Sequence, residues 1–432
     1  MKIYRRYLIG LIVLLFLEVP TALGQTPTER VARIQADEGY QRALAFIDED
    51  YPLFVEELIE LTEIPAPPFM ESERGTAYLE KLQELGLESL EIDAVGNVMG
   101  IRPGGNGPLL AVAAHLDTVF PEGTDVRVRR EGTRLSAPGI GDDTAGLAVL
   151  LAVIRAMDAA GIQTSGDILF VGNVGEEGPG DLRGIKNLFL EGPYSDRIDG
   201  FLSVEGGRQV DITNAALGSK RYRVTFSGPG GHSYNAFGLV SPAFAIGNAI
   251  RKLSDLEVSE DPKTTYNVGV IGGGTSVNSI PFESWMEVDI RSEERERLAS
   301  VSETFLELMY EAVAEENAAR STGQGPIELD IEVIGDRPSG EISLDTPLVE
   351  STAAAFRAFG IEPIYSRSST DSNIPISLGI PAVTIDRGGM GGRSHSLDEW
   401  VDVEKPGTVK GIGLVLTTIL AITGLEETRV TD

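Results

Sequence analysis

The stretch PLLAVAAHLDTV, residues 108–119, decides the fold of this chain. It is apolar almost without interruption, which is typical of a strand buried on both faces of a parallel sheet. Two further apolar strands are predicted at DILFVGNVG, residues 167–175, and at GFLSVEG, residues 200–206. Between the first two strands, TAGLAVLLAVIRAMDAAG, residues 144–161, has the length and apolar content of a buried helix. Strands that alternate with helices predict an α/β domain built on a mostly parallel sheet.

The sequence pattern changes at about residue 217, where apolar and polar residues begin to alternate. From there to residue 336 we predict four strands, at 220–228, 264–274, 283–292 and 327–335, and two helices, at 241–254 and 294–319. This order is typical of a small α+β domain. The earlier pattern then resumes, so residues 217–336 are predicted to be an insert that divides the first domain into residues 25–216 and 337–432.

The first 24 residues have the three parts of a secretory signal peptide. Basic residues precede an apolar run from Tyr7 to Leu17, and small residues follow up to Gly24. Glu18 and Pro20 interrupt the run before it reaches the ~20 residues that span a bilayer. We therefore predict cleavage after Gly24 and an exported protein, periplasmic or secreted, without stable membrane insertion. An uncleaved anchor is the alternative.

The composition of the chain argues against several classes of function. The 432 residues include 66 acidic and 36 basic side chains, for a formal net charge of -30. Such a charge gives no basic surface for nucleic acid and disfavours contact with anionic lipid. The chain has no cysteine, so a metal site would have to use histidine and carboxylate ligands.

The chain contains three histidines, His115, His232 and His395, each in a loop-like or strand-end context. His115 and Asp117 are two residues apart at the end of the first apolar strand, so their side chains should point to the same face. We expect the Asp117 carboxylate to accept a hydrogen bond from the His115 ring and fix its tautomer, as metal-bound histidines usually require. His395 lies in a glycine-rich loop with no apolar face to fill.

Carboxylates stand at the ends of the other predicted strands. Glu176 and Glu177 follow the second strand, and Glu205 ends the third. Asp142 and Asp143 precede the buried helix, where acidic residues have a second explanation as N-caps. Because ligands of parallel sheets gather at the carboxyl ends of the strands, this set predicts a site for zinc or a similar divalent ion.

With these motifs the sequence resembles the co-catalytic zinc exopeptidases and amidohydrolases. This family includes aminoacylase, peptidase T, succinyl-diaminopimelate desuccinylase and bacterial glutamate carboxypeptidases. HLDTV, GDDTAG, EEG and GGRSHS match its metal motifs, and GPGGHSY and DIR match motifs of its inserted domain. The resemblance covers nearly all of the chain after the N-terminal segment. It implies that the α/β domain is catalytic and that the insert is a lid and dimerisation domain, so we expect a homodimer.

The resemblance implies two divalent metal ions per chain, zinc by preference, with Co²⁺ or Mn²⁺ as alternatives. It assigns one ion to His115, Asp142 and Glu205, and the other to Asp142, Glu177 and His395, with Asp142 as the bridge. The family's bridging aspartate stands two residues before the Lys or Thr of its loop. That position is Asp142 rather than Asp143.

The resemblance also implies roles in catalysis and substrate binding. Glu176 would be the general base that takes a proton from the attacking water and returns it to the leaving amine. His232 would stabilise the oxyanion in the active site of the partner subunit. Asn278 and Arg291 match residues that bind a substrate carboxylate. Each also has a simpler explanation, Asn278 as a turn residue and Arg291 as an exposed strand charge.

Other hydrolase motifs do not occur in the sequence. It has no G-x-S-x-G elbow, no H-E-x-x-H helix and no nucleotide phosphate loop. We predict an exported metal-dependent exopeptidase or amidohydrolase that acts on a small peptide or an N-acyl amino acid. Glu205 favours a carboxypeptidase or deacylase, because family aminopeptidases tend to have Asp there.

Two alternatives to this function stay open. RSSTD, residues 367–371, resembles peptidase T, which favours an aminopeptidase or a di- or tripeptidase. A catalytically silent peptide-binding protein on the same scaffold is the alternative from another class. The intact Glu176 argues against it, because a binding protein has no need of the base.

Overall fold

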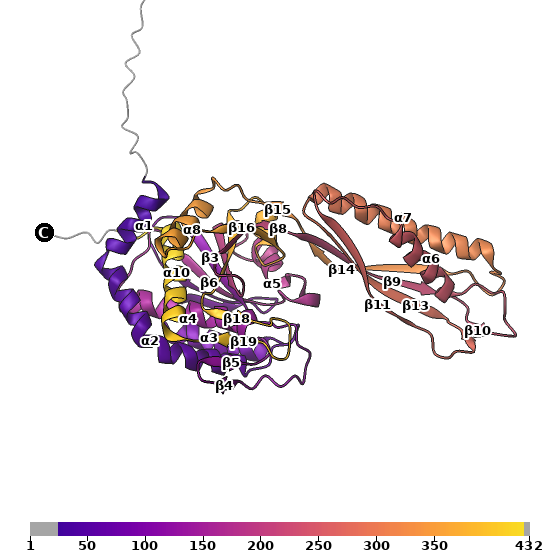
Figure 1. Cartoon of the computed structure of the whole chain (residues 1–432), viewed down its shortest axis with the longest axis horizontal. Coiled ribbons are helices and arrows are strands. Elements are labelled where there is room, and N and C mark those ends of the chain that lie inside the picture. The colour runs from indigo at the N-terminus through magenta and orange to yellow at the C-terminus, as the bar shows by residue number, and fades with distance from the viewer. Residues whose placement is uncertain (1–24, 427–432) are drawn as a thin grey trace, which may run out of the picture.

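The computed structural model describes residues 25–426, so the predicted signal peptide lies outside the described residues. The chain forms two lobes that lie side by side along the long axis of the molecule (Figure 1). The larger lobe is built from both ends of the described chain. The smaller lobe is built from the middle, as expected for an insert.

A nine-stranded mixed sheet forms the centre of the larger lobe. In spatial order its strands are β1 (Glu88–Ile92), β2 (Val98–Arg102), β6 (Ile168–Asn173), β3 (Leu109–His115), β7 (Ile198–Glu205), β17 (Ala382–Asp386), β8 (Asp211–Ala216) and β15 (Gly340–Glu341), and β16 (Ile364–Ser368) pairs with β8. The four central strands, β6, β3, β7 and β17, run parallel to one another. Antiparallel strands extend the sheet at both edges.

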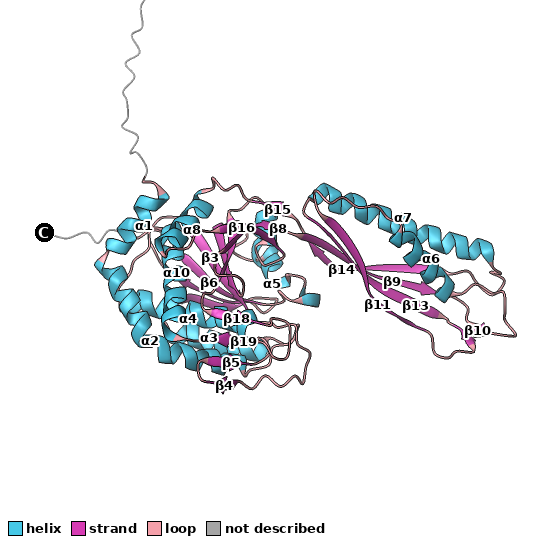
Figure 2. Cartoon of the chain, viewed as in Figure 1, coloured by secondary structure: helices cyan, strands magenta, loops and turns pink. Residues whose placement is uncertain are grey.

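Helices surround this sheet (Figure 2). They are α1 (Pro27–Ala36), α2 (Glu38–Thr62), α3 (Ser72–Glu84), α4 (Ala145–Ala159), α5 (Arg183–Lys186), α8 (Pro347–Ala358), α9 (Asn373–Ser377) and α10 (Lys405–Thr423). Helix α10 packs against α2, α4 and α8, and α2 also packs against α4. Helices α4, α8 and α10 contact sheet strands as well.

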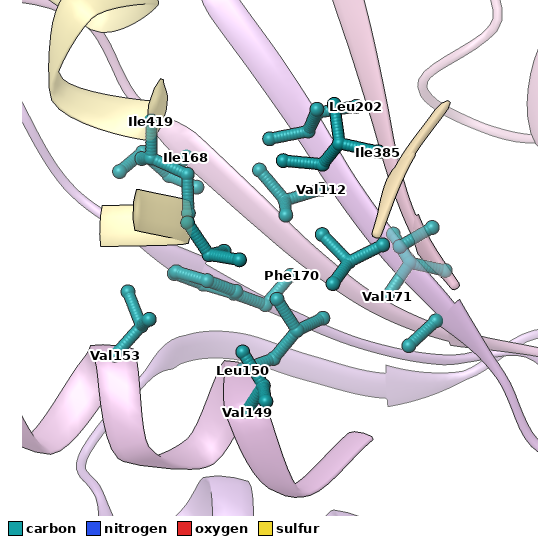
Figure 3. Close-up of a cluster of buried hydrophobic side chains, with 14 of the residues drawn as sticks. Val112, Val149, Leu150, Val153, Ile168, Phe170, Val171, Leu202, Ile385 and Ile419 are labelled. Atoms are coloured by element: carbon teal, nitrogen blue, oxygen red, sulfur yellow. The ribbon is translucent and has the colours of Figure 1, made fainter. Parts of the chain in front are cut away.

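The core of the larger lobe explains why its strands read as continuous apolar runs. Val149, Leu150 and Val153 of α4 and Ile419 of α10 meet side chains of the parallel strands, among them Phe170 (Figure 3). Every residue of β3 is buried. Burial of both faces of each central strand leaves no place for the polar residues that would otherwise alternate with apolar ones.

Helix α10 is long and apolar enough to cross a membrane by length and composition. In the structure 72% of its apolar window is buried inside the protein, where it packs on α2, α4 and α8. Its composition is therefore accounted for by the core.

The smaller lobe is a four-stranded antiparallel sheet with two helices. In spatial order the strands are β11 (Thr264–Gly273), β13 (Glu283–Ser292), β9 (Gly218–Ser227) and β14 (Glu328–Arg337), and the helices are α6 (Pro242–Ser254) and α7 (Arg295–Ala319). Buried and partly exposed residues alternate strictly along β13, because the helices cover only one face of the sheet. A short pair, β10 (Gly231–His232) and β12 (Ser279–Ile280), lies beyond this sheet.

The predicted fold class, a mostly parallel α/β domain with an inserted α+β domain of four strands and two helices, is confirmed. The four strands of the insert form a separate antiparallel sheet. The larger lobe also has a small second sheet that was not predicted from the sequence. Its strands are β18 (Met390–Gly392), β19 (Trp400–Asp402), β5 (Arg134–Ser136) and β4 (Arg129–Glu131), in that order. Three-residue strands are too short to show a period of two.

Candidate active site and metal centre

Three parallel strands bring acidic and histidine side chains to one edge of the central sheet. β3 ends on His115 and β7 ends on Glu205, while Glu176 and Glu177 follow the end of β6. β3 lies between β6 and β7 and is parallel to both. The C-terminal ends of the three strands therefore meet, as expected for a ligand site in a parallel sheet.

The Asp142 carboxylate lies between two histidines. Its Oδ1 atom is 3.0 Å from Nε2 of His115, and its Oδ2 atom is 3.3 Å from Nε2 of His395. The two histidines are 280 residues apart in the chain, and one carboxylate contacts both. This is the geometry that a bridging ligand between two metal ions requires.

Asp143, by contrast, is fully buried behind the histidine. Its Oδ2 atom accepts a hydrogen bond of 3.2 Å from the backbone N–H of His115. Helix α4 begins at Ala145, and no side chain caps its first turn. The N-cap explanation for Asp142 and Asp143 is therefore wrong, and of the two only Asp142 contacts both histidines.

Glu177 completes a compact group of metal-ligand atoms. Its Oε1 atom is 2.8 Å from Nε2 of His395, and the donor atoms of His115, Asp142 and Glu177 all lie within 4.8 Å of one another. Like charges this close repel unless a cation or proton lies between them. Imidazole nitrogens and carboxylate oxygens are ligands that Zn²⁺ accepts. The residues fit a divalent ion.

The acidic neighbours of His115 and His395 raise the pKa of both rings. Hydrogen bonds to Asp142 and Glu177 raise the pKa of His395 to about 10. Burial works against a charge on His115, but the hydrogen bond to Asp142 and the nearby carboxylates still raise its pKa well above the ordinary value. A divalent cation that binds such a site replaces protons.

Glu205 lies beside this group, outside the set of donor atoms within 4.8 Å. It lines the same cavity as Asp142, and its Oε1 atom accepts a hydrogen bond of 2.6 Å from Ser203. Burial, and after it the charge of Glu176, raise the pKa of Glu205 to about 8. An acid with this pKa keeps its proton at neutral pH, and a cation that binds it would displace that proton.

Asp117 acts differently from the expectation. The Nδ1 atom of His115 is 3.0 Å from the backbone carbonyl oxygen of Asp117, and the nearest Asp117 carboxylate oxygen is 3.7 Å away. The carbonyl, not the carboxylate, is thus in hydrogen-bond range. The Asp117 carboxylate instead accepts the backbone N–H groups of Glu176 and Glu177, at 3.0 and 2.8 Å. It fixes the loop that carries both glutamates.

Glu176 has a partner that the sequence analysis missed. Nη1 of Arg337 donates a hydrogen bond of 3.0 Å to Oε1 of Glu176, and Nη2 of the same arginine donates to the Glu176 backbone carbonyl. Both side chains are buried. Arg337 is the last residue of β14, where the insert returns to the larger lobe. Its place before Pro338, at the predicted domain boundary, was the available signal.

The ligand groups line a cavity of about 490 Å³ between the two lobes. Its walls include Asp142, Glu176, Glu177, Glu205 and His395 and also Arg208, Arg221, Arg291, Arg337 and Arg367. Asp289 holds two of these arginines, with Oδ1 3.2 Å from Nε of Arg221 and Oδ2 2.7 Å from Nε of Arg291. The Arg291 guanidinium is thereby oriented, and it lies on the cavity wall. A bound carboxylate is within its chemistry.

His232 and Asn278 lie elsewhere in the described chain. Both are exposed and belong to the β10–β12 region, where the backbone N–H of Ser233 donates to the Asn278 carbonyl at 3.0 Å. β10 lies at the end of the smaller lobe that is farthest from the larger lobe (Figure 1). Arg291, near the opposite end of β13, pairs with Ser219 at the start of β9. The expected joint carboxylate site of Arg291 and Asn278 is therefore not formed within one chain.

Comparison with known proteins identifies a family over most of the chain. Residues 111–421 match the family model described as Peptidase family M20/M25/M40. The matched range contains all five predicted metal ligands, Glu176, and the whole insert.

Individual relatives agree with that match. Carboxypeptidase G2 of Pseudomonas sp. (strain RS-16) is 25% identical over 219 residues, which is 49% of this chain and 51% of that protein. Aminopeptidase PepT from Bacillus cereus has a similar structure, with a TM-score of 0.68, 23% identity, and coverage of 86% of this chain and 98% of that one. Bacillus subtilis YXEP, described as a dinuclear metal binding peptidase from the M20 family, has a TM-score of 0.63 and 18% identity. The match covers 88% of this chain and 99% of YXEP.

Proposed function

This chain belongs to peptidase family M20/M25/M40 and is a metal-dependent hydrolase of the peptidase and amidohydrolase class, and from this premise we propose that it is an exported exopeptidase or deacylase that recognises a substrate carboxylate. The observation that carries the proposal is the cavity that places the metal-ligand group and the oriented guanidinium of Arg291 on the same walls. An exopeptidase needs both, one for the scissile bond and one for the chain end.

The residues divide the chemical work. His115, Asp142, Glu177, Glu205 and His395 would hold two divalent ions, zinc by our proposal. Such ions lower the pKa of water and polarise the scissile carbonyl. Glu176 stands next to Glu177 on the loop that Asp117 fixes. We assign it the role of the general base, which takes the proton of the attacking water and returns it to the leaving nitrogen.

Arginines supply the substrate recognition in this proposal. Arg291 is held by Asp289, and its side chain keeps 36% exposure. Arg337 is buried against Glu176. A substrate carboxylate that reached Arg291 would exchange water for a forked, preoriented donor. Arg208 pairs with Asp211, and Arg221 and Arg367 donate to backbone carbonyls. We favour Arg291 because the DIR motif that contains it matches the family motif for carboxylate binding.

A substrate panel tests the proposal. The zinc-loaded protein is incubated with each of four substrate types, and the rates of hydrolysis are compared. The substrates are N-blocked dipeptides, C-amidated dipeptides, free tripeptides and N-acetyl amino acids. We expect hydrolysis of N-blocked dipeptides or N-acetyl amino acids and none of C-amidated substrates. Arg291→Lys should raise KM for the accepted substrates more than it lowers kcat, because Lys lacks the fork. Hydrolysis of C-amidated peptides that requires a free amine would overturn the proposal.

That overturning result would favour the second candidate function. The whole-chain structural similarity to aminopeptidase PepT supports an aminopeptidase or small-peptide peptidase, as does the RSSTD segment. The partial match to carboxypeptidase G2 supports the first candidate. The panel separates the two, because they need opposite termini of the substrate.

We also propose a homodimer that forms through strand β11. β11 and β14 are the two edges of the insert's sheet. β14 carries Glu328, Asp330 and Glu332, whereas β11, TTYNVGVIGG, has no charged residue. Charged side chains protect an edge from pairing, and an uncharged edge is a template for another strand. β11 is therefore the edge through which a second copy could extend the sheet.

Export is proposed from residues 1–24 alone. If the signal peptide is removed, the mature protein begins at Gln25, shortly before α1. Mass spectrometry of the protein purified from its natural host would give the mass of the chain from residue 25. The mass of the full chain would contradict export by cleavage.

A further inference from the structure

A buried glutamate outside the predicted site holds the loop that carries the bridging aspartate. Glu399 is 1% exposed. Its Oε1 atom accepts the backbone N–H groups of Gly141 and Asp142, at 2.8 and 2.9 Å, and its Oε2 atom accepts that of Gly139 at 3.0 Å. Hydrogen bonds from N–H groups to a carboxylate are charge-assisted and strong, and Glu399 accepts three of them.

Strand pairing explains how Glu399 reaches this loop. β19 follows Glu399 directly and pairs with β5 so that Trp400 lies opposite Ser136. The pairing continues one step further, because the N–H of Ala137 donates to the Glu399 carbonyl at 3.1 Å. The chain after Ala137 turns through Gly139 to Asp142. The Glu399 side chain is thereby directed into the turn.

The other side of the loop has a second clamp. Nε of Arg387 donates a hydrogen bond of 3.1 Å to the carbonyl oxygen of Gly141. Gly141 itself leaves room for both groups, because a Cβ atom there would lie 3.0 Å from Oε1 of Glu399 and 3.3 Å from Nη2 of Arg387. The peptide groups before Asp142 are therefore fixed from two directions.

We propose that Glu399 is a positioning residue for the metal centre, which aims the Asp142 carboxylate at both metal positions. Glu399 is four residues after His395, and its carboxylate accepts a hydrogen bond from the backbone N–H of Asp142. It thus couples the loop of one histidine to the ligand that contacts both. Asp142 presents one oxygen to His115 and the other to His395, and a free loop would lose that orientation. The proposal rests on the metal site proposed above.

Glu399→Gln is the variant that separates the hydrogen bonds from the side-chain volume. The amide keeps one oxygen but places an NH₂ group against a backbone N–H. If the amide oxygen accepts from Gly141 and Asp142, the NH₂ group faces the N–H of Gly139 and that hydrogen bond is lost. In the reverse orientation the hydrogen bonds from Gly141 and Asp142 are lost. Removal of a group that orients metal ligands typically weakens metal binding ~10- to 100-fold. We expect that loss for zinc.

Glu316→Gln is the matched control. Glu316 is fully buried and accepts a backbone N–H, that of Ser241, at 2.9 Å. It lies in the insert, on α7, and its partners, Ser241 and Arg320, do not belong to the metal loop. It therefore reports what the loss of a buried carboxylate does to stability alone.

The experiment titrates zinc into chelator-treated protein against a chromophoric competing chelator, and it follows thermal unfolding of the same metal-free samples. We expect Glu399→Gln to bind zinc ~10- to 100-fold more weakly and Glu316→Gln to bind it like wild type. Equal zinc affinity in Glu399→Gln and wild type would overturn the positioning role, and so would an equal loss in both variants. Wild type that binds no zinc would reject the metal site itself, and the positioning role with it.

If Glu399→Gln does not fold, Glu399→Asp replaces it. Aspartate keeps the charge but withdraws both oxygens by one methylene from the three N–H groups. We expect a smaller loss of zinc affinity in the same direction. Wild-type affinity in Glu399→Asp, with no folded Glu399→Gln, would also overturn the proposal.

Discussion

At the scale of single residues, the two adjacent glutamates of the loop after β6 differ through their partners. Glu177 contacts His395, whereas Glu176 contacts Arg337. Glu177 therefore faces the metal-ligand group, and Glu176 faces a guanidinium on the cavity wall. The backbone N–H groups of both are held by the same Asp117 carboxylate, so neither can shift without the other. Neighbours in sequence thus acquire separate roles.

Glu176→Gln should retain the metal ions and lose most of the turnover. The amide is nearly isosteric and can still accept from Arg337, but it cannot take a proton, and loss of a general base costs ~10²- to 10⁴-fold. The measurement is kcat with metal content on the same samples. Glu57→Gln is the control, because Glu57 is also buried and paired with an arginine, Arg155, at 2.7 Å. Near-normal kcat in Glu176→Gln would show that another group is the base.

Glu205 should make the metal-free protein less stable as the pH rises. Burial and the charge of Glu176 raise its pKa from 4.5 to about 8. Between these values the folded state binds more protons than the unfolded state, so the free energy of unfolding falls with rising pH. Urea unfolding at pH 5 and pH 8 would measure the fall. Glu205→Gln should reduce it, and an unchanged slope in that variant would contradict the shifted pKa.

Asp142 and His395 could be predicted from their motifs, GDDTAG and GGRSHS, and the other metal ligands from their places at the ends of long apolar strands. His115, Glu177 and Glu205 each follow such a strand, and a parallel sheet brings strand ends together. Arg337 and Glu399 could not be found in this way. Each contacts a partner that is far away in the chain. Arg337 lies where the insert returns to the larger lobe, and Glu399 lies next to the three-residue strand β19. The periodicity of apolar residues along the sequence does not indicate such long-range contacts.

At the scale of elements, the same physical rule explains what was predicted and what was missed. Strands β3 and β6 are long and buried throughout, so composition reveals them. Strands β5 and β19 each have three residues and lie apart from the main sheet, yet they align the Asp142 loop with Glu399. Their position depends on hydrogen bonds to each other, and their composition is not distinctive.

The two edges of the insert's sheet should respond differently to an added charge. Ile271 on β11 and Val333 on β14 are similarly exposed, at 59% and 55%. If copies pair through β11, Ile271→Lys would bring like charges together across the pair and convert the dimer to monomers. Val333→Lys should leave the dimer intact. Sedimentation velocity of wild type and both variants measures this, and a dimer in both variants would exclude the β11 edge.

At the scale of the whole molecule, the two lobes separate His232 from the other residues that we predict to act in the reaction. Four of the predicted metal ligands, Asp142, Glu177, Glu205 and His395, line the cavity between the two lobes, and β10 lies at the far end of the smaller lobe (Figure 1). His232 on β10 does not line the cavity of its own chain. Its exposed ring is therefore available to another active site, and a dimer built on the insert offers one. A complete site would then need two chains.

Mixed dimers should test that arrangement directly. Glu176→Gln removes the base, and His232→Ala removes the oxyanion group, so each homodimer should be nearly inactive. In a mixed dimer the site with an intact Glu176 receives His232 from the Glu176→Gln partner, and one of the two sites regains both groups. We expect kcat per mixed dimer to approach half that of wild type. The chains would carry different tags so that mixed dimers can be purified. Activity no higher than that of the parent variants, in dimers shown to be mixed, would mean that His232 does not act across subunits.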